Sequence, residues 1–239
     1  MIERHLMKLR ARDTVSAEEE QAIRELVAEV RNVPADNTLI HAGQVLSHSV
    51  LLLDGILCRY KDLSEGQRQI TELHAPGDFA DLHSFTLKRL DHSVMSLTPA
   101  RIAIIPHERL ERITERLPHL TRLYWFTTNL DAAIHREWEV SLGRRSAISR
   151  IAAIFCEMKL RFEIVQMTDG MSYNFDLTQT DLAECVGLTP IHVNRTLKEL
   201  REQGLVQFRS GRVTIQDWDG LTEVAEFDPA YLYLEKWKL

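Results

Sequence analysis

The stretch LTQTDLAECVGLTPIHVNRTLKEL, at residues 177–200, constrains the fold more than any other part of the chain. Thr178 is a good helix N-cap with Asp181 three residues on, which is a variant of the capping box. Gly187 tolerates the left-handed conformation that ends a helix, and Thr189 then caps a second helix. The pattern predicts two short helices joined by a tight turn, which is the helix-turn-helix arrangement.

The second of these helices has two chemically different faces. Val193, Leu197 and Leu200 recur at spacings of four and three residues, so they predict a buried face. The opposite face carries polar and basic side chains, namely His192, Asn194, Arg195 and Lys198. A helix-turn-helix presents such a face to the major groove of DNA.

A β-hairpin is predicted directly after the second helix. Residues 205–208 and 212–215 alternate between apolar and polar side chains around the turn Ser210-Gly211. A helix-turn-helix that is followed by a hairpin is a winged helix. Arg209 and Arg212, at the tip of this wing, are placed to contact phosphates.

The small positive charge of the predicted winged helix limits the affinity for DNA that can be expected of it. The chain of 239 residues has a net charge of −6, whereas residues 178–215 hold five basic and four acidic side chains. One surplus positive charge predicts modest non-specific affinity for DNA. Tight binding would therefore need a dimer, which doubles the number of phosphate contacts.

Composition favours a globular protein of the reducing cytoplasm. Hydrophobic residues make up 44% of the chain, which is ordinary for folded domains. Cys58, Cys156 and Cys185 are widely spaced and include no CxxC pair, which favours small buried thiols. The N-terminus has charges but no apolar segment of the kind that targets a chain for secretion. The longest apolar run, at residues 50–58, is too short to cross a membrane, so no membrane partner is expected.

Residues 31–106 predict an antiparallel barrel or β jelly roll. Short apolar runs in this region are separated by turn residues, and Asp54-Gly55 and Glu65-Gly66 stand at positions typical of hairpins. Ahead of this region, residues 1–13 form a polar lead. Residues 16–30 predict a helix with an apolar stripe along its length.

A short helix at residues 108–117 leads to a long helix at residues 119–142. A helix of about 24 residues is about 36 Å long, which is more than a small β-domain needs. A coiled coil between two subunits accounts for the excess length, and an ordinary core helix is the alternative. The seam of the coiled coil is predicted to include Leu123, Thr127, Leu130 and Ile134.

The remaining residues complete a C-terminal domain around the winged motif. Gly143-Arg144-Arg145 is predicted to be a hinge, followed by a helix at 146–162, a loop through Gly170 and a last helix at 218–226. The aromatic tail is expected to pack on the surface of this domain. The chain is therefore predicted to be an α+β protein in three parts: an N-terminal helix and jelly-roll sensor domain at 1–117, a dimerisation helix and hinge at 118–143, and a winged helix-turn-helix domain at 144–239.

The order of β-barrel, long helix, hinge and winged helix resembles the CRP/FNR family of bacterial transcription regulators. The tracts DGILCRYKDLSEGQRQITELHAPGDF and LTQTDLAECVGLTPIHVNRTLKELREQGLV carry the resemblance, which covers essentially the whole chain. GLTPIHVNRTL looks like a subgroup found among α-proteobacteria. The resemblance implies a homodimer that binds a two-fold symmetric site on double-stranded DNA and regulates RNA polymerase there. It also implies that the jelly roll, which is similar to a cyclic-nucleotide-binding domain, is a sensor.

The sequence departs from the cyclic-nucleotide-binding members of that family at the residues that hold the ligand. Where those members carry Gly-Glu-Leu and an Arg-Ser pair, this chain has Ala80-Asp81-Leu82 and His92-Ser93. A neutral histidine is a poor substitute for the arginine that neutralises the cyclic phosphate, so cyclic AMP is not the expected effector. A pocket for an unknown effector would involve Asp81, Leu82, His83, His92 and Ser93.

Two other types of cofactor in the family lack support in the sequence. No cysteine lies in the first 57 residues, so an N-terminal iron–sulfur cluster has no ligands. The histidines of the barrel are scattered, as is typical of a polar surface, and no metal site is predicted from them.

By motif position, residues 189–198 form the recognition helix. Pro190 and Ile191 stand where the cyclic-AMP-binding relatives carry Arg and Glu, so the preferred DNA sequence is expected to differ. Arg195 matches a base-reading position and suits guanine, and Ile191 suits a thymine methyl group. The predicted base contacts are Ile191, His192, Asn194 and Arg195, of which His192 and Asn194 are equally compatible with solvent or phosphate. The predicted phosphate contacts are Thr178, Gln179, Thr180, Thr189, Lys198, Arg209 and Arg212.

Of two other functional classes, one is kept as an alternative and one is not expected. A sensor or adaptor with a vestigial winged helix is the alternative, and the small surplus of positive charge supports it. An enzyme is not expected, because the chain has no nucleophile elbow, P-loop, HExxH or clustered acid pair.

Overall fold

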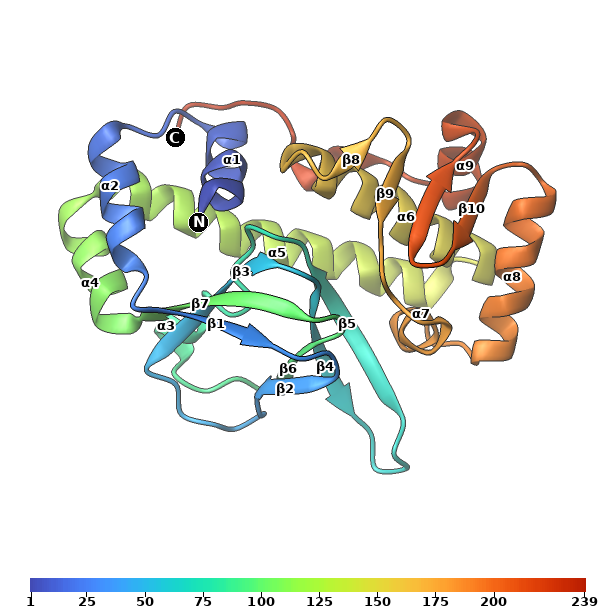
Figure 1. The fold of residues 1–239 in the computed structure, drawn as a ribbon, viewed down its shortest axis with the longest axis horizontal. Helices are drawn as coiled ribbons and strands as arrows, with labels where there is room; N and C mark the ends of the chain where they lie inside the picture. Colours follow the sequence, from blue (N-terminus) through green and yellow to red (C-terminus); the bar gives the residue numbers. More distant parts are fainter.

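The computed structural model describes all 239 residues as a β-domain with helices before it, one long helix and a C-terminal domain (Figure 1). Two antiparallel sheets face each other in the β-domain. One sheet has the order β1 (Glu29–Val33), β7 (Ala100–Pro106) and β3 (His48–Asp54). The other has the order β2 (Asn37–Ile40), β6 (Ser93–Ser96), β4 (Leu57–Asp62) and β5 (Arg68–His74). Leu52, Leu57 and Val94 are buried between them, which confirms the predicted antiparallel β-domain.

Helices surround this β-domain. α1 (Glu3–Arg12) and α2 (Ala17–Leu26) precede it, α3 (Ser84–Leu87) interrupts it, and α4 (His107–Arg116) leads into α5 (Pro118–Arg144). In Figure 1, α5 runs along the molecule, with the sheets on one side and α1 on the other. None of the helices combines the length and the apolar character that crossing a bilayer requires.

The C-terminal domain begins immediately after α5. It consists of α6 (Ala147–Ile164), β8 (Thr168–Asp169), β9 (Ser172–Asn174), α7 (Gln179–Val186), α8 (Pro190–Glu202), β10 (Val206–Arg209), β11 (Arg212–Ile215), α9 (Trp218–Ala225) and a 3-10 turn at Pro229–Leu232. β10 and β11 pair as the predicted wing hairpin. One apolar core runs without a break from Leu73 of β5 through Ile134 of α5 to Phe155, Leu182 and Val213.

The first 33 residues differ from the prediction. The supposed polar lead is α1, in which His5, Leu6 and Leu9 are buried at a spacing that follows the helix period. The next helix ends at Leu26 instead of residue 30, because residues 29–33 pair with β7 as a strand. A charged surface on α1 concealed its short apolar stripe in the sequence.

The two predicted hairpin turns have different outcomes. Glu65-Gly66 joins β4 to β5, which pair with each other, so this hairpin is confirmed. Asp54-Gly55 is not a hairpin, because β3 pairs with β7 while β4 pairs with β5 and β6. Gly55 instead turns the chain from one sheet to the other at φ 90°, where a Cβ atom would lie 2.6 Å from Pro99 O.

The C-terminal half also corrects three expectations. α5 continues through Arg144, so Gly143 is helical and only Arg145 and Ser146 separate α5 from α6. The expected loop through Gly170 contains the β8–β9 hairpin. The aromatic part of the tail packs on the C-terminal domain as expected, through Phe227 and Tyr231, but the end of the tail crosses to the N-terminal helices, where Leu239 N donates to Asp13 Oδ2 at 2.7 Å.

Candidate nucleic-acid interface and sensor pocket

Side-chain caps fix both helices of the helix-turn-helix, as the sequence predicts. Thr178 Oγ1 accepts from Asp181 N at 3.1 Å, and the Asp181 carboxylate accepts from the Thr178 N–H and hydroxyl. Gly187 ends α7 at φ 65°, and Thr189 Oγ1 accepts from His192 N at 3.2 Å. Both donors of Thr178 are used inside the capping box. The exposed Gln179 and Thr180 are therefore better placed for phosphate than Thr178 is.

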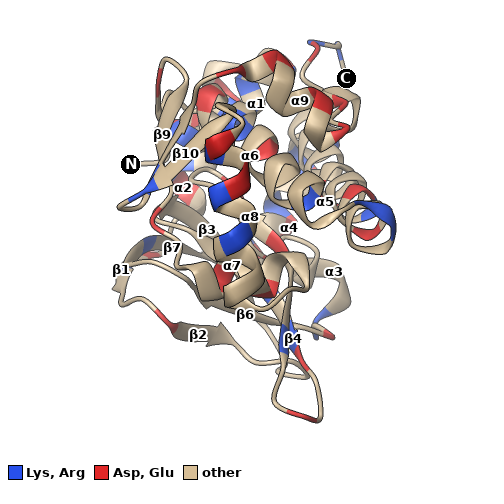
Figure 2. Cartoon of the chain, turned by 90° about the vertical axis from the view of Figure 1, so that its right-hand side faces the viewer, with Lys and Arg blue, Asp and Glu red and all other residues tan.

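The outer face of α8 is free for a ligand. Val193, Thr196 and Leu200 are buried against the domain, whereas Ile191 is 84% exposed. Asn194, Arg195 and Lys198 are exposed, and His192 is half-buried. Asn194 Nδ2 donates to Gln179 Oε1 at 3.2 Å, so these two predicted DNA contacts lie together across α7 and α8. Figure 2 looks onto this surface and shows both basic and acidic segments on α8.

The two arginines of the wing are not equivalent. Arg209 is exposed and forms no hydrogen bond or ion pair. Arg212 donates from Nη1 to Asn174 Oδ1 and from Nη2 to Asp169 Oδ2, both at 3.2 Å. A phosphate would therefore have to compete with Asp169 for Arg212, while Arg209 is free to bind.

Two of the predicted effector-pocket residues have structural roles. Asp81 is completely buried, and its carboxylate accepts from Val50 N at 2.6 Å and from Ser84 Oγ at 2.9 Å. Burial raises the pKa of Asp81 to about 6 despite these hydrogen bonds. Leu82 packs in the core beside Phe79. The prediction that Asp81 faces a ligand is wrong, because backbone and hydroxyl donors already use its carboxylate.

A buried arginine that the sequence did not single out lies beside residues 80–93, which we call the cassette because they stand where the cyclic-nucleotide-binding relatives hold their ligand. Arg59 of β4 is 2% exposed and donates from Nε to Ala80 O at 2.8 Å. Its Nη1 donates to Glu72 Oε2 at 2.6 Å, and its Nη2 donates to Asp131 Oδ2 of α5 at 2.8 Å. Burial raises the pKa of Glu72 and of Asp131, and a neighbouring carboxylate adds to the effect in each case: Asp131 at Glu72, and Asp78 at Asp131. A charged residue inside the apolar tract GILCRY was the available sequence signal.

Three histidines lie beside this arginine. The rings of His83 and His92 are 5.4 Å apart between centroids, and His135 Nε2 is 3.3 Å from Glu72 Oε2. Burial lowers the pKa of all three, to about 3 for His83 and about 4 for His135, and the charge of Arg59 contributes. Ser93 Oγ accepts from Ala42 N at 3.1 Å. The structure thus brings His83 and His92 together but arranges no three acidic, histidine or cysteine side chains to hold a metal ion.

The loop Pro76-Gly77-Asp78 connects three parts of the molecule. Asp78 forms ion pairs with Lys8 of α1 and with Arg161 of α6, and the Arg161 pair measures 2.9 Å. Gly77 adopts φ 95° where a Cβ atom would lie 2.7 Å from Arg4 O, so glycine is required for this close approach. The loop therefore holds α1 and the C-terminal domain against the barrel.

The helix-turn-helix also contacts the barrel directly. Gln69 Nε2 of β5 donates to Glu184 O at 2.8 Å and to Cys185 O at 3.2 Å, at the C-terminal end of α7. These carbonyls have no partner within the helix, so Gln69 provides the acceptors with a donor. The position of the C-terminal domain is thereby tied to the barrel.

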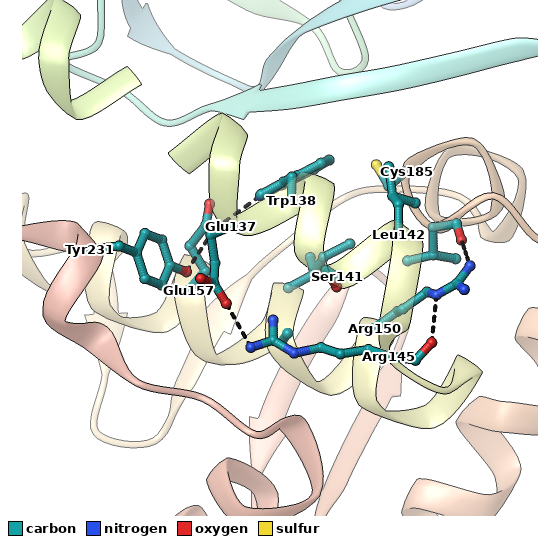
Figure 3. Close-up of a pocket in the computed structure, with 12 residues that line it drawn as sticks. Glu137, Trp138, Ser141, Leu142, Arg145, Arg150, Glu157, Cys185 and Tyr231 are labelled. Atoms are coloured by element: carbon teal, nitrogen blue, oxygen red, sulfur yellow. Dashed lines mark hydrogen bonds and ion pairs between the residues drawn. The ribbon is translucent and has the colours of Figure 1, made fainter. Parts of the chain in front are cut away.

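A second joint links α5 to the C-terminal domain (Figure 3). Glu157 Oε2 of α6 accepts from Trp138 Nε1 at 3.0 Å and from Tyr231 Oη at 2.8 Å. Arg150 Nη1 donates to Val186 O at 3.0 Å, next to the turn of the helix-turn-helix. The cavity at this joint measures about 20 Å³, which is room for a single water molecule. The joint is therefore structural.

The predicted seam of the long helix is wrong. Leu123 and Ile134 are buried in two different apolar clusters of their own chain, and Leu130 packs against the cluster that contains Ile134. Thr127 Oγ1 donates to Tyr124 O within the helix. The free face of α5 lies on the other side, at spacings of three and four residues, and consists of Trp125, Asn129, Ala132, Arg136 and Val140. The helical spacing of apolar residues thus predicted that this face is buried, but not that its own chain buries it.

Comparison with known proteins agrees with this architecture. A model described as a cyclic nucleotide-binding domain matches residues 30–116, and a Crp-like helix-turn-helix domain matches residues 149–224. The transcriptional activator protein FnrL of Cereibacter sphaeroides is 27% identical over 216 residues, 88% of this chain and 86% of that protein. The fumarate and nitrate reduction regulatory protein of Escherichia coli is 20% identical over 212 residues, 89% of this chain and 84% of that protein.

Solved structures share the fold over most of this chain. The structure of FixK2 from Bradyrhizobium japonicum matches with a TM-score of 0.75 and 22% identity, over 83% of this chain and 98% of that chain. The c-di-GMP-responsive regulator CLP of Xanthomonas campestris matches with a TM-score of 0.65 and 15% identity, over 84% of this chain and 99% of that chain. The arrangement of barrel, long helix and winged helix is therefore common to these proteins.

Proposed function

Because the chain belongs to the CRP/FNR family of DNA-binding transcription regulators, we propose that it acts as a homodimer on a two-fold symmetric DNA site and regulates RNA polymerase there. The exposed outer face of α8 carries this proposal. Arg195 forms no ion pair or hydrogen bond within the chain, and Ile191 is 84% exposed. The name of FnrL, a transcriptional activator, supports activation as the mode of regulation.

The proposed DNA contacts divide into base and phosphate contacts. Arg195 is proposed to bind guanine, with His192, Asn194 and Ile191 on neighbouring base edges. The positions available for phosphate contacts are Gln179, Thr180, Thr189, Lys198, Arg209 and, in competition with Asp169, Arg212. The exposure of these side chains supports this division.

The free face of α5 supports the homodimer. Trp125 is 67% exposed and Val140 is 52% exposed on a helix whose other face is buried. Two copies of this face, related by a two-fold axis, would bury both side chains in a coiled-coil contact. A dimer of this kind sets two recognition helices about 34 Å apart, which is one turn of DNA.

The sensor pocket supports an effector other than cyclic AMP. Arg59 and its two carboxylate partners lie beside Ala80, His83 and His92, where the related cassette holds its ligand. A cyclic phosphate there would be repelled by the carboxylates of Glu72 and Asp131, and it would have to compete with them for the guanidinium of Arg59. The expected result of titrating the protein with cyclic AMP in a calorimeter is no binding in the micromolar range.

Selection from random duplex DNA tests the function. The expected product is a palindrome with half-sites about one helical turn apart and two chains per duplex in sedimentation analysis. The affinity is expected to fall steeply with salt, because phosphate contacts release counterions. A slope near zero, or no enriched sequence, would instead support an adaptor with a vestigial winged helix.

Substitution of the exposed tryptophan tests the dimer. Trp125→Glu is expected to produce a monomer that loses affinity for the palindrome. Trp237 is 61% exposed in the tail, so Trp237→Glu is the matched control and is expected to remain dimeric. A dimeric Trp125→Glu protein would contradict the proposed interface.

A further inference from the structure

A cavity of about 250 Å³ lies between α1, α5, α6 and the C-terminal tail, and we name it the tail cavity. None of its lining residues belongs to the recognition helix, the wing or a β-strand. Nine of its fifteen lining residues are hydrophobic, and they include the aliphatic side chains of Leu130, Ile134, Leu160, Ile164 and Leu232. The tail cavity thus lies apart from the proposed DNA surface, and it meets the pocket around Arg59 only at Asp131, which pairs with Arg59.

Five of the six charged side chains that line the tail cavity already have oppositely charged partners. Asp78 is paired with both Lys8 and Arg161. Asp131 is paired with Arg59 at 2.8 Å, and Glu163 is paired with Lys159 at 2.9 Å. The sixth, Arg12, forms no ion pair. An incoming ion would therefore meet one uncompensated charge, and that charge is positive.

The environment of Arg12 leaves part of its guanidinium unsatisfied. Its Nη1 donates to Glu235 O at 3.0 Å, and its guanidinium carbon lies 4.4 Å from the centre of the Phe126 ring. Its Nε is buried and has no hydrogen-bond partner. A buried donor without an acceptor is unfavourable, because it has lost its hydration without replacement. A carboxylate or similar anion in the cavity would supply the missing negative charge and would accept from Nη2, which also has no hydrogen-bond partner in the chain.

We propose that the tail cavity binds a small organic anion with an apolar body, of the class of medium-chain carboxylates, whose charged group pairs with Arg12. Aliphatic side chains line the cavity, so they suit the body of such a molecule. An engineered apolar cavity of about 150 Å³ accepts benzene. A cavity of about 250 Å³ therefore has room for a body of roughly eight carbon atoms.

The location gives this ligand a connection to the rest of the molecule. Leu130 and Ile134 belong to α5, which carries the proposed dimer face, and Leu160 and Ile164 belong to α6 of the DNA-binding domain. Leu232 and Leu234 belong to the tail, which returns to α1. A molecule in the tail cavity would contact all of these segments at once, so its binding would be linked to their relative positions.

Calorimetric titration of the full chain without DNA tests the proposal with octanoate and 1-octanol as matched probes. Octanoate is expected to bind at least tenfold more tightly than octanol. Arg12→Gln is expected to weaken octanoate about tenfold and to leave octanol unchanged. Arg10→Gln is the control, since Arg10 is an exposed arginine of the same helix outside the cavity. Ala11→Leu and Leu234→Trp, which obstruct the cavity from two sides, are expected to abolish binding of both probes.

Several results would overturn the proposal. The first is that octanoate does not bind at concentrations up to millimolar. The second is that octanoate and octanol bind with equal affinity. The third is that octanoate still binds to Arg12→Gln and to both obstructed variants. The Leu234→Trp change lies on a partly exposed tail residue, so it tests the cavity even if Ala11→Leu fails to fold. Because no DNA is present, failure here leaves the proposed function intact, and failure of the DNA selection leaves this site intact.

Discussion

Arg59 of β4 donates from Nη2 to Asp131 Oδ2 of α5 at 2.8 Å, although the two residues are 72 positions apart in the sequence. The same guanidinium donates to Glu72 and to the Ala80 carbonyl, so one side chain joins the barrel interior to the long helix. In this chain, therefore, the side chain of Arg59 connects the cassette to α5.

Removing Arg59 should destabilise the fold strongly. Arg59→Met leaves Glu72 and Asp131 buried without a cation, and loss of one partner of a buried ion pair typically costs about 3–5 kcal/mol. Urea unfolding at neutral pH measures the change in free energy. Lys61→Met is the control on the same strand, because Lys61 pairs with Asp91 at the surface, where such pairs contribute about 0–1 kcal/mol. Equal losses in the two variants would show that Arg59 is not the connection described above.

Asp78 should make stability dependent on pH in the acid range. Burial alone would raise the pKa of Asp78, but Lys8 and Arg161 outweigh burial and lower this pKa to about 2. An aspartate in an unfolded chain has a pKa of about 3.9, so the folded state favours the charged form. The resulting stabilisation is present above about pH 4 and is lost as the pH falls towards 2.

The Asp78→Asn variant measures this contribution. The difference in unfolding free energy from the unmodified protein is expected to be on the order of 2 kcal/mol at pH 6 and to shrink towards pH 3. Glu65→Gln, in the exposed loop between β4 and β5, is the control and should show no such trend. A difference that is constant from pH 6 to pH 3 would contradict the assigned ion pairs.

The features that the sequence predicted well are local ones. Thr178, Gly187 and Thr189 act on backbone groups within three or four residues, so their spacing alone predicted both helices of the motif. Arg59 and Asp131 meet only after the whole barrel has folded, and no local pattern indicates that contact. The sequence did show a charged residue inside an apolar strand, which is a signal for a buried partner. It did not show which partner.

The same distinction explains the errors in α5 and α1. The helical spacing of apolar residues correctly located an apolar face through Leu123 and Ile134. The spacing cannot show whether the same chain or a second chain covers that face. In α1, the buried Leu6 and Leu9 are flanked by charged residues that dominate a composition-based reading. Both errors concern what packs against an element, which depends on the tertiary fold.

Gln69 should control how firmly the DNA-reading domain is held. Gln69→Ala removes the donor to the carbonyls of Glu184 and Cys185, so these groups lose a hydrogen bond at the end of α7. Hydrogen exchange of the α7 amides is expected to become faster. Gln67→Ala, in the neighbouring exposed loop, is the matched control and should leave α7 unchanged. Unaltered exchange in Gln69→Ala would mean that the contact does not hold the domain.

Arg195 should contribute to sequence reading and not only to general affinity. It is exposed on α8 with no partner in the chain, and a bidentate contact between arginine and guanine contributes about 1–3 kcal/mol of discrimination. Arg195→Ala is therefore expected to weaken binding to the selected palindrome by that amount and to relax the preference at one position of each half-site. Arg201 is exposed on a different side of the same helix, so Arg201→Ala is the control and should preserve the preference. If Arg195→Ala instead weakens all duplexes equally and lowers the salt dependence, Arg195 contacts phosphate and the base contact must lie elsewhere on α8.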